Sequence, residues 1–85
     1  MYEIRLSHDA QKFYQAAADP LARRLNRCFE QLRRDPYRHP NIRRLKGPLA
    51  EYWRYRVSDW RVVYYVHEDE HIVTVVLIVH RSKAY

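Results

Sequence analysis

The residues best suited to chemistry are arginines that alternate with large aromatic side chains between positions 42 and 61. This segment reads IRRLKGPLAEYWRYRVSDWR. Successive side chains of a β-strand point to opposite faces of its sheet. Arg54 and Arg56 therefore share one face, while Trp53 and Tyr55 take the other. A row of guanidinium groups on a rigid strand is suited to binding the phosphates of a nucleic acid.

The positive charge of the chain is concentrated in this region. Residues 36–61 contain seven Lys/Arg and two Asp/Glu, a net charge of +5, whereas the whole chain has 16 Lys/Arg and 10 Asp/Glu, or +6. Taken one at a time, arginines are usually solvated surface groups, so the argument depends on their clustering. A localised basic surface attracts a polyanionic partner. The candidates for nucleic-acid binding beside the strand arginines are Arg43, Arg44 and Lys46, with Lys83 near the C-terminus.

The C-terminal run HRSKAY is a second candidate for chemistry. The imidazole of His80 can exchange protons near neutral pH. The guanidinium of Arg81 can hold a phosphoryl oxygen, and the phenol of Tyr85 can stack on a base. A polar tail after the last strand explains the same residues equally well.

Several classes of protein are excluded by composition. The five histidines and the single cysteine lack the spacing of metal ligands, and Cys28 has no partner for a disulfide. One glycine leaves no phosphate-binding glycine loop, and no cofactor motif is present. Neither a signal peptide nor an apolar run of about 20 residues occurs. We expect one domain over residues 1–85, without metal, cofactor or membrane span, in the cytoplasm.

The spacing of apolar residues predicts the helices and strands that position these side chains. Alternation predicts a strand over residues 2–6, and Ser7 is a candidate N-cap for a helix that ends near residue 18. Asp19 is the candidate N-cap of a second helix, with Pro20 at its first helical position, and this helix ends before Pro36. Strands are expected at about residues 52–58, 60–67 and 71–80. An apolar stripe should pack the helices on the sheet, and its residues are Phe13, Leu25, Cys28, Phe29 and Leu32.

The order β-α-α-β-β-β predicts an α+β fold. An N-terminal strand and a helical hairpin precede an antiparallel meander, and the helices pack on one face of a four-stranded antiparallel sheet. By parity, Val75, Leu77 and Arg81 share one face of the last strand. If this face coincides with that of Arg54, Arg56 and Arg61, four arginines converge.

The chain resembles the RelE/ParE toxin superfamily of bacterial toxin–antitoxin systems. The resemblance rests on Leu45-Lys46-Gly47, on the run from Tyr52 to Tyr64, on His80-Arg81 and on the closing Tyr85. The order of elements agrees over essentially the whole chain, although the helical half agrees in pattern only. The resemblance implies a single RelE-like toxin domain.

A RelE-like identity implies a ribosome-dependent endoribonuclease that cleaves mRNA in the ribosomal A site. The ribose 2′-OH attacks the adjacent phosphate and leaves a cyclic phosphate. The catalytic residues carried over are Arg54, Arg56, Arg61, Arg81 and Tyr85. RelE has lysines at the positions of Arg54 and Arg56, and arginine stays protonated, so a base at Arg54 is not expected. His80 or Tyr85 is the candidate for proton transfer.

Two alternatives remain. A ParE-like toxin shares the fold and inhibits DNA gyrase without cutting nucleic acid, and a basic RNA-binding module would not be toxic. The presence of Arg61, Arg81 and Tyr85 favours the nuclease over the gyrase inhibitor. As partners, the resemblance implies a cognate RelB-like antitoxin, in a possible hetero-oligomer, together with the ribosome and mRNA. No membrane partner is expected.

Overall fold

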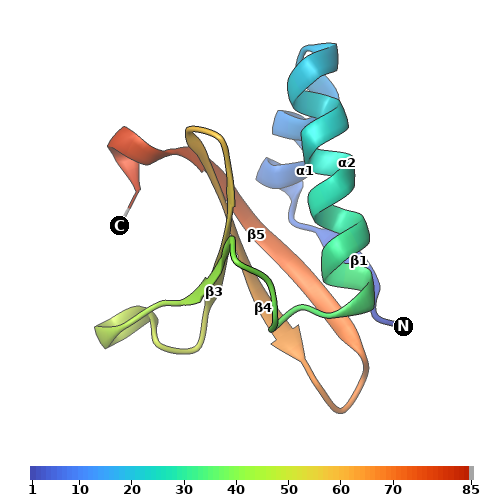
Figure 1. The fold of residues 1–85 in the computed structure, drawn as a ribbon, viewed down its shortest axis with the longest axis vertical. Coiled ribbons are helices and arrows are strands. Elements are labelled where there is room, and N and C mark those ends of the chain that lie inside the picture. The colour runs from blue at the N-terminus through green and yellow to red at the C-terminus, as the bar shows by residue number, and fades with distance from the viewer. Residues whose placement is uncertain (85) are drawn as a thin grey trace.

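Two helices cover one face of a β-sheet in the computed structural model, which describes residues 1–84 (Figure 1). The other face carries the loop before β3 and the segment after β5 (Figure 1). The elements are β1 (Glu3–Leu6), α1 (His8–Ala16), α2 (Asp19–Arg34), β2 (Ile42–Arg44), β3 (Trp53–Val57), β4 (Trp60–His67) and β5 (Ile72–His80), with 3₁₀ turns η1 (Gly47–Leu49) and η2 (Arg81–Lys83).

The sheet confirms the α+β class and the predicted order of the main elements. Its strand order is β1-β5-β4-β3-β2, so it has five strands rather than the predicted four. β1 runs parallel to β5, while the other pairs are antiparallel. The prediction of a wholly antiparallel sheet was therefore wrong. β1 and β5 are far apart in the chain, so no hairpin turn dictates their relative direction. β2 was missed because three residues show too little alternation.

The first helix begins with the predicted side-chain cap, whereas the second helix does not. Ser7 is the N-cap of α1, and its hydroxyl accepts a hydrogen bond from the Ala10 amide at 3.2 Å, as predicted. The N-cap of α2 is Ala18, without a side-chain hydrogen bond, and not the predicted Asp19. Asp19 is instead the first helical residue, where its charge still interacts favourably with the helix dipole.

The predicted apolar stripe faces the core. Leu25, Cys28 and Leu32 are fully buried, Phe29 is 8% exposed, and Phe13 packs against the same cluster. On the sheet side they meet fully buried side chains, Val62, Tyr64, Val73 and Val75. The Tyr64 hydroxyl donates to the Pro36 carbonyl at 2.7 Å, which satisfies the only polar atom of this buried side chain. No helix within residues 1–84 is both long and apolar enough to cross a membrane.

A β-bulge in β5 changes which residues face the helices. Val63 pairs with Leu77, but its neighbour Tyr64 pairs with Val75, so Val76 is an additional residue. Val75 is consequently buried in the core, whereas Leu77 is 42% exposed on the uncovered face. The expectation that Val75 and Leu77 share a face was wrong, because the additional residue Val76 places them on opposite faces of the sheet.

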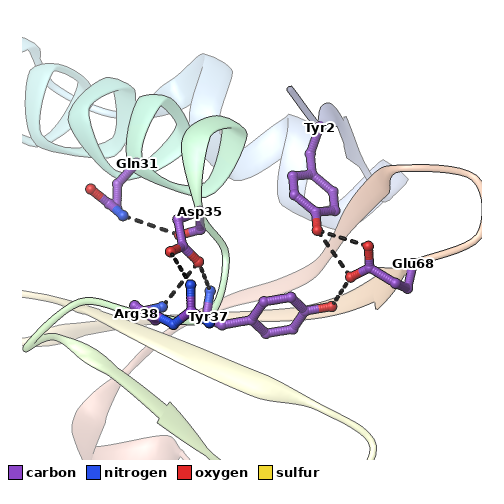
Figure 2. A network of polar contacts seen from close by, with 6 residues as sticks. All are labelled: Tyr2, Gln31, Asp35, Tyr37, Arg38 and Glu68. Atoms are coloured by element: carbon purple, nitrogen blue, oxygen red, sulfur yellow. Dashed lines mark hydrogen bonds and ion pairs between the residues drawn. The ribbon is translucent and has the colours of Figure 1, made fainter.

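A polar cluster ties the N-terminus and the loop after α2 to the β4–β5 hairpin (Figure 2). The Tyr2 hydroxyl lies 2.9 Å from both carboxylate oxygens of Glu68, and the Tyr37 hydroxyl donates to the same group. His71 stacks on the Tyr2 ring at 4.3 Å. The Asp35 carboxylate accepts from the Tyr37 amide at 2.9 Å, which fixes the loop that presents Tyr37. This cluster lies at the opposite end of the sheet from the β3–β4 turn (Figure 1).

Candidate nucleic-acid interface

The strand register brings the predicted arginines side by side. Arg56 pairs with Arg61 across β3 and β4, and Arg43 pairs with Arg54 across β2 and β3. Their immediate neighbours, such as Tyr55, are buried under the helices. Because side chains alternate along each strand, these arginines lie on the face that the helices leave uncovered.

The close approach of these charges has a physical consequence. Like charges directly opposite each other destabilise a sheet, so the Arg56–Arg61 pair does not serve stability. Backbone carbonyls hold two of the arginines. Arg61 Nη1 donates to the carbonyls of Ser58 (3.2 Å) and Trp60 (3.1 Å), and the half-buried Arg54 donates through Nη1 to Asn41 at 2.8 Å. The arrangement favours binding of an anion by donors that are already oriented.

Arg81 approaches the same end of the sheet from the C-terminal segment. Its backbone amide donates to the Asp59 carbonyl at 2.8 Å, and its Nε lies 3.6 Å from Asp59 Oδ1. Since Arg61 pairs with Val79, Arg81 follows two residues beyond that pair. Three predicted catalytic arginines, at positions 56, 61 and 81, are thus gathered near the β3–β4 turn, while Arg54 lies two residues further along β3.

The other predicted C-terminal residues are arranged differently. His80 pairs with Trp60, and its ring packs edge-on against that indole at 5.2 Å, on the side of the sheet that faces α1. His80 Nδ1 also accepts from the Ser82 amide at 3.2 Å, so the ring caps η2. The structure does not bring His80 onto the arginine face. Lys83 is exposed in η2, and Tyr85 lies outside the described residues.

Two basic residues before β3, Arg44 and Lys46, were also predicted to bind nucleic acid. Arg44 lies over the Trp53 ring at 5.5 Å and donates through Nε to the Ala50 carbonyl at 2.9 Å. Because Arg44 pairs with Trp53, it lies on the opposite face from Arg43. Lys46 is exposed next to Gly47, whose φ of +65° is accessible to glycine at little energetic cost.

Two grooves border the arginine row. A cleft of about 310 Å³ between α2 and β3 is lined by Arg24 and Arg27 as well as Arg56. An apolar groove of about 360 Å³ on the uncovered face is lined by Leu49, Tyr52, Val63, Val76 and Leu77. The sequence reasoning assigned no site role to Arg24, Arg27, Asn41 or Asp59. The sequence did contain an indication of a role for Asp59, because this residue is the only acidic one from Trp53 to His67.

Guanidinium groups are the main charged groups in the described part of the site. Within residues 1–84, no three His, Cys, Asp or Glu side chains gather closely enough to hold a metal ion. Burial raises the pKa of the Cys28 thiol, which disfavours the thiolate that a nucleophile requires. Positively charged donors therefore dominate the described part of the interface.

Residues 4–85 match the family model of the ParE toxin of type II toxin–antitoxin systems. The chain belongs to this family. Among curated proteins, none matches its sequence. The match covers the helices, the sheet and the C-terminal segment alike, so the arginine face is part of the family domain.

Solved structures show the same fold. The archaeal RelE–RelB complex from Pyrococcus horikoshii is 21% identical, with 98% of each chain covered and a TM-score of 0.82. A YoeB/ParE toxin from Agrobacterium tumefaciens is 20% identical over 92% of this chain and 96% of its own, with a TM-score of 0.82. The RelBE2 complex from Mycobacterium tuberculosis is 22% identical over 94% and 98%, with a TM-score of 0.80. These family toxins share the fold of this chain.

Proposed function

We propose that this type II toxin is a ribosome-dependent endoribonuclease that cleaves mRNA in the ribosomal A site. The observation that carries the proposal is the gathering of Arg56, Arg61 and Arg81 near the β3–β4 turn. The opposed pair Arg56–Arg61 is unfavourable for the sheet by itself, but it is suited to an anion.

The chemistry follows from the charge that develops at phosphorus. The ribose 2′-oxygen forms a bond to the scissile phosphorus, the bond from phosphorus to the 5′-oxygen breaks, and a 2′,3′-cyclic phosphate remains. The pentacoordinate intermediate carries more negative charge than the substrate, and preoriented guanidinium groups stabilise it. Solvent water accepts the proton of the 2′-OH and supplies a proton to the 5′-oxygen, because arginine stays protonated and cannot act as the base.

The roles of the remaining residues follow from their places. Arg43 and Arg54 bind flanking phosphates, because they lie on the same face of the sheet as Arg56 and Arg61. Tyr85 stacks on a base in this proposal, and the ribosome orients the mRNA. The contact of His80 with Trp60 and its cap of η2 favour a supporting role over proton transfer. The toxin acts in the cytoplasm, where translating ribosomes are found.

A cognate antitoxin is the second partner in this proposal. The archaeal and mycobacterial structures are toxin–antitoxin complexes. The apolar groove of Leu49, Val63 and Leu77 lies on the same face as the arginines, so an acidic amphipathic antitoxin segment would cover both. Such a hetero-oligomer would block access of RNA to the site.

The test is a cleavage assay with purified toxin, ribosomes and a defined mRNA. We expect A-site cleavage with a cyclic phosphate end, only when ribosomes are present. The family match to ParE toxins favours one alternative, inhibition of DNA gyrase. A supercoiling assay with purified gyrase runs in parallel. Gyrase inhibition without any mRNA cleavage would refute the nuclease proposal and support the ParE-like alternative.

A further inference from the structure

The two-residue β3–β4 turn and the residue after it contact two of the proposed catalytic arginines, Arg61 and Arg81. Ser58 and Trp60 supply the two carbonyls that accept from Arg61 Nη1. Asp59 supplies a backbone carbonyl to the amide of Arg81 and a carboxylate to its guanidinium. The turn thus contacts both arginines, although Arg61 belongs to β4 and Arg81 to η2.

Ser58 has a φ of +55°, which is costly for a residue with a Cβ atom. Such strain is frequently retained where local geometry serves function. In this turn, the positive φ belongs to the residue whose carbonyl accepts from Arg61.

The geometry at Arg81 distinguishes two sides of its guanidinium. Asp59 approaches Nε at 3.6 Å, within ion-pair range but beyond a hydrogen bond. The Arg81 side chain is 64% exposed, so its guanidinium is accessible from solvent. A carboxylate at Nε orients the planar group while its outer edge remains available for a phosphoryl oxygen.

We propose that Asp59 is a positioning residue that orients Arg81 toward the scissile phosphate. The inference rests on the proposed nuclease function. Both side chains are about 60% exposed, and an exposed ion pair adds little to folding stability. The backbone bond between the same two residues already fixes their separation, so the side-chain contact restricts rotation of a flexible arginine. Donors that are oriented before the reaction stabilise its charge without further reorganisation.

The test compares Asp59→Asn with Asp69→Asn, which makes the same charge change in the β4–β5 turn. With ribosome-bound mRNA, Asp59→Asn should lower kcat about tenfold, because small misplacements of a catalytic group are costly. KM should stay constant or fall, because the substitution removes a negative charge from a basic surface that binds RNA. Asp59→Glu should recover part of the rate, and Asp69→Asn should behave as wild type. A kcat for Asp59→Asn within twofold of wild type would overturn the proposal.

A second measurement does not depend on activity. The Arg81 Nε–Hε signal in the NMR spectrum of the free toxin, assigned by its loss in Arg81→Lys, reports side-chain order through its heteronuclear NOE. We expect this NOE to fall in Asp59→Asn and to stay unchanged in Asp69→Asn. An unchanged NOE in Asp59→Asn would refute positioning, even if the rate fell, because the carboxylate would then act directly. Absence of cleavage by wild type would refute the nuclease proposal, while the NOE still decides whether Asp59 restrains Arg81.

Discussion

The two faces of the sheet have opposite properties, although the same strands form both. Toward the helices, Val62 and Tyr64 are fully buried in a close-packed core. On the other face, the alternating positions of β3 and β4 include Arg54, Arg56 and Arg61. Alternation along a strand therefore separates the residues that stabilise the fold from the residues that are available for binding. A substitution on one face should change folding, and a substitution on the other should change the interaction with nucleic acid.

The core side of this comparison is tested by Leu25→Ala. Leu25 is fully buried between α2 and the sheet, so the free energy of unfolding should fall by about 2–5 kcal/mol. Urea denaturation of the free toxin measures this change. Arg23→Ala, exposed on the same helix, should change stability by less than about 0.5 kcal/mol. A loss below about 0.5 kcal/mol for Leu25→Ala would contradict the role of this stripe.

Arg61→Ala and Arg81→Ala should have the opposite effect. The cleavage rate should fall at least about 10²-fold, equivalent to about 2.7 kcal/mol, because a donor to the phosphorane is lost. The free energy of unfolding should stay within about 0.5 kcal/mol. Arg81→Lys should also lose much of the rate, since an ammonium lacks the planar fork. Single-turnover cleavage of ribosome-bound mRNA at the wild-type rate by folded Arg81→Ala would exclude this role.

The salt dependence of ribosome binding should differ between variants of the arginine face and variants of the helix surface. Binding to ribosomes should weaken steeply as salt rises, because arginines displace counterions from phosphates. Arg43→Gln should reduce the slope of log affinity against log salt by about one. Arg23→Gln on α2 should leave it unchanged. Affinity that stays constant between low and moderate salt would refute the phosphate interface.

The smallest effect is expected at Glu68, far from the β3–β4 turn. The hydrogen bond from Tyr37, followed by that from Tyr2, lowers the pKa of Glu68 below its ordinary value of 4.5. Ionised Glu68 therefore contributes stability that is complete above pH 4.5 and is lost as pH falls through the lower folded pKa. The stability difference between wild type and Glu68→Gln should shrink in acid. Equilibrium unfolding at several pH values measures it, with the neighbouring Glu70→Gln as control. A difference that grows in acid would contradict this sign.

Local patterns were sufficient for much of the fold. The Ser7 cap and the stripe of Leu25, Phe29 and Leu32 were predicted because capping and helical periodicity depend on residues only a few positions apart. Alternation along β3 likewise predicted that Arg54 and Arg56 share a face. The site residues at positions 54, 56, 61 and 81 could be proposed from the sequence for the same reason, with the family resemblance.

Local residue patterns predicted the helix starts near Ser7 and Asp19, the alternation of apolar and basic side chains along β3, and the consecutive antiparallel pairing of β3, β4 and β5. Four features became evident only in the folded structure: the bulge at Val76, the parallel pairing of β1, the separation of Arg44 from Arg43, and the contact of Asp59 with Arg81. These features depend on pairing between segments that are distant in the chain. One additional residue in a strand moves every following side chain to the opposite face of the sheet. Alternation on one side of a bulge therefore does not predict which face the side chains beyond it occupy.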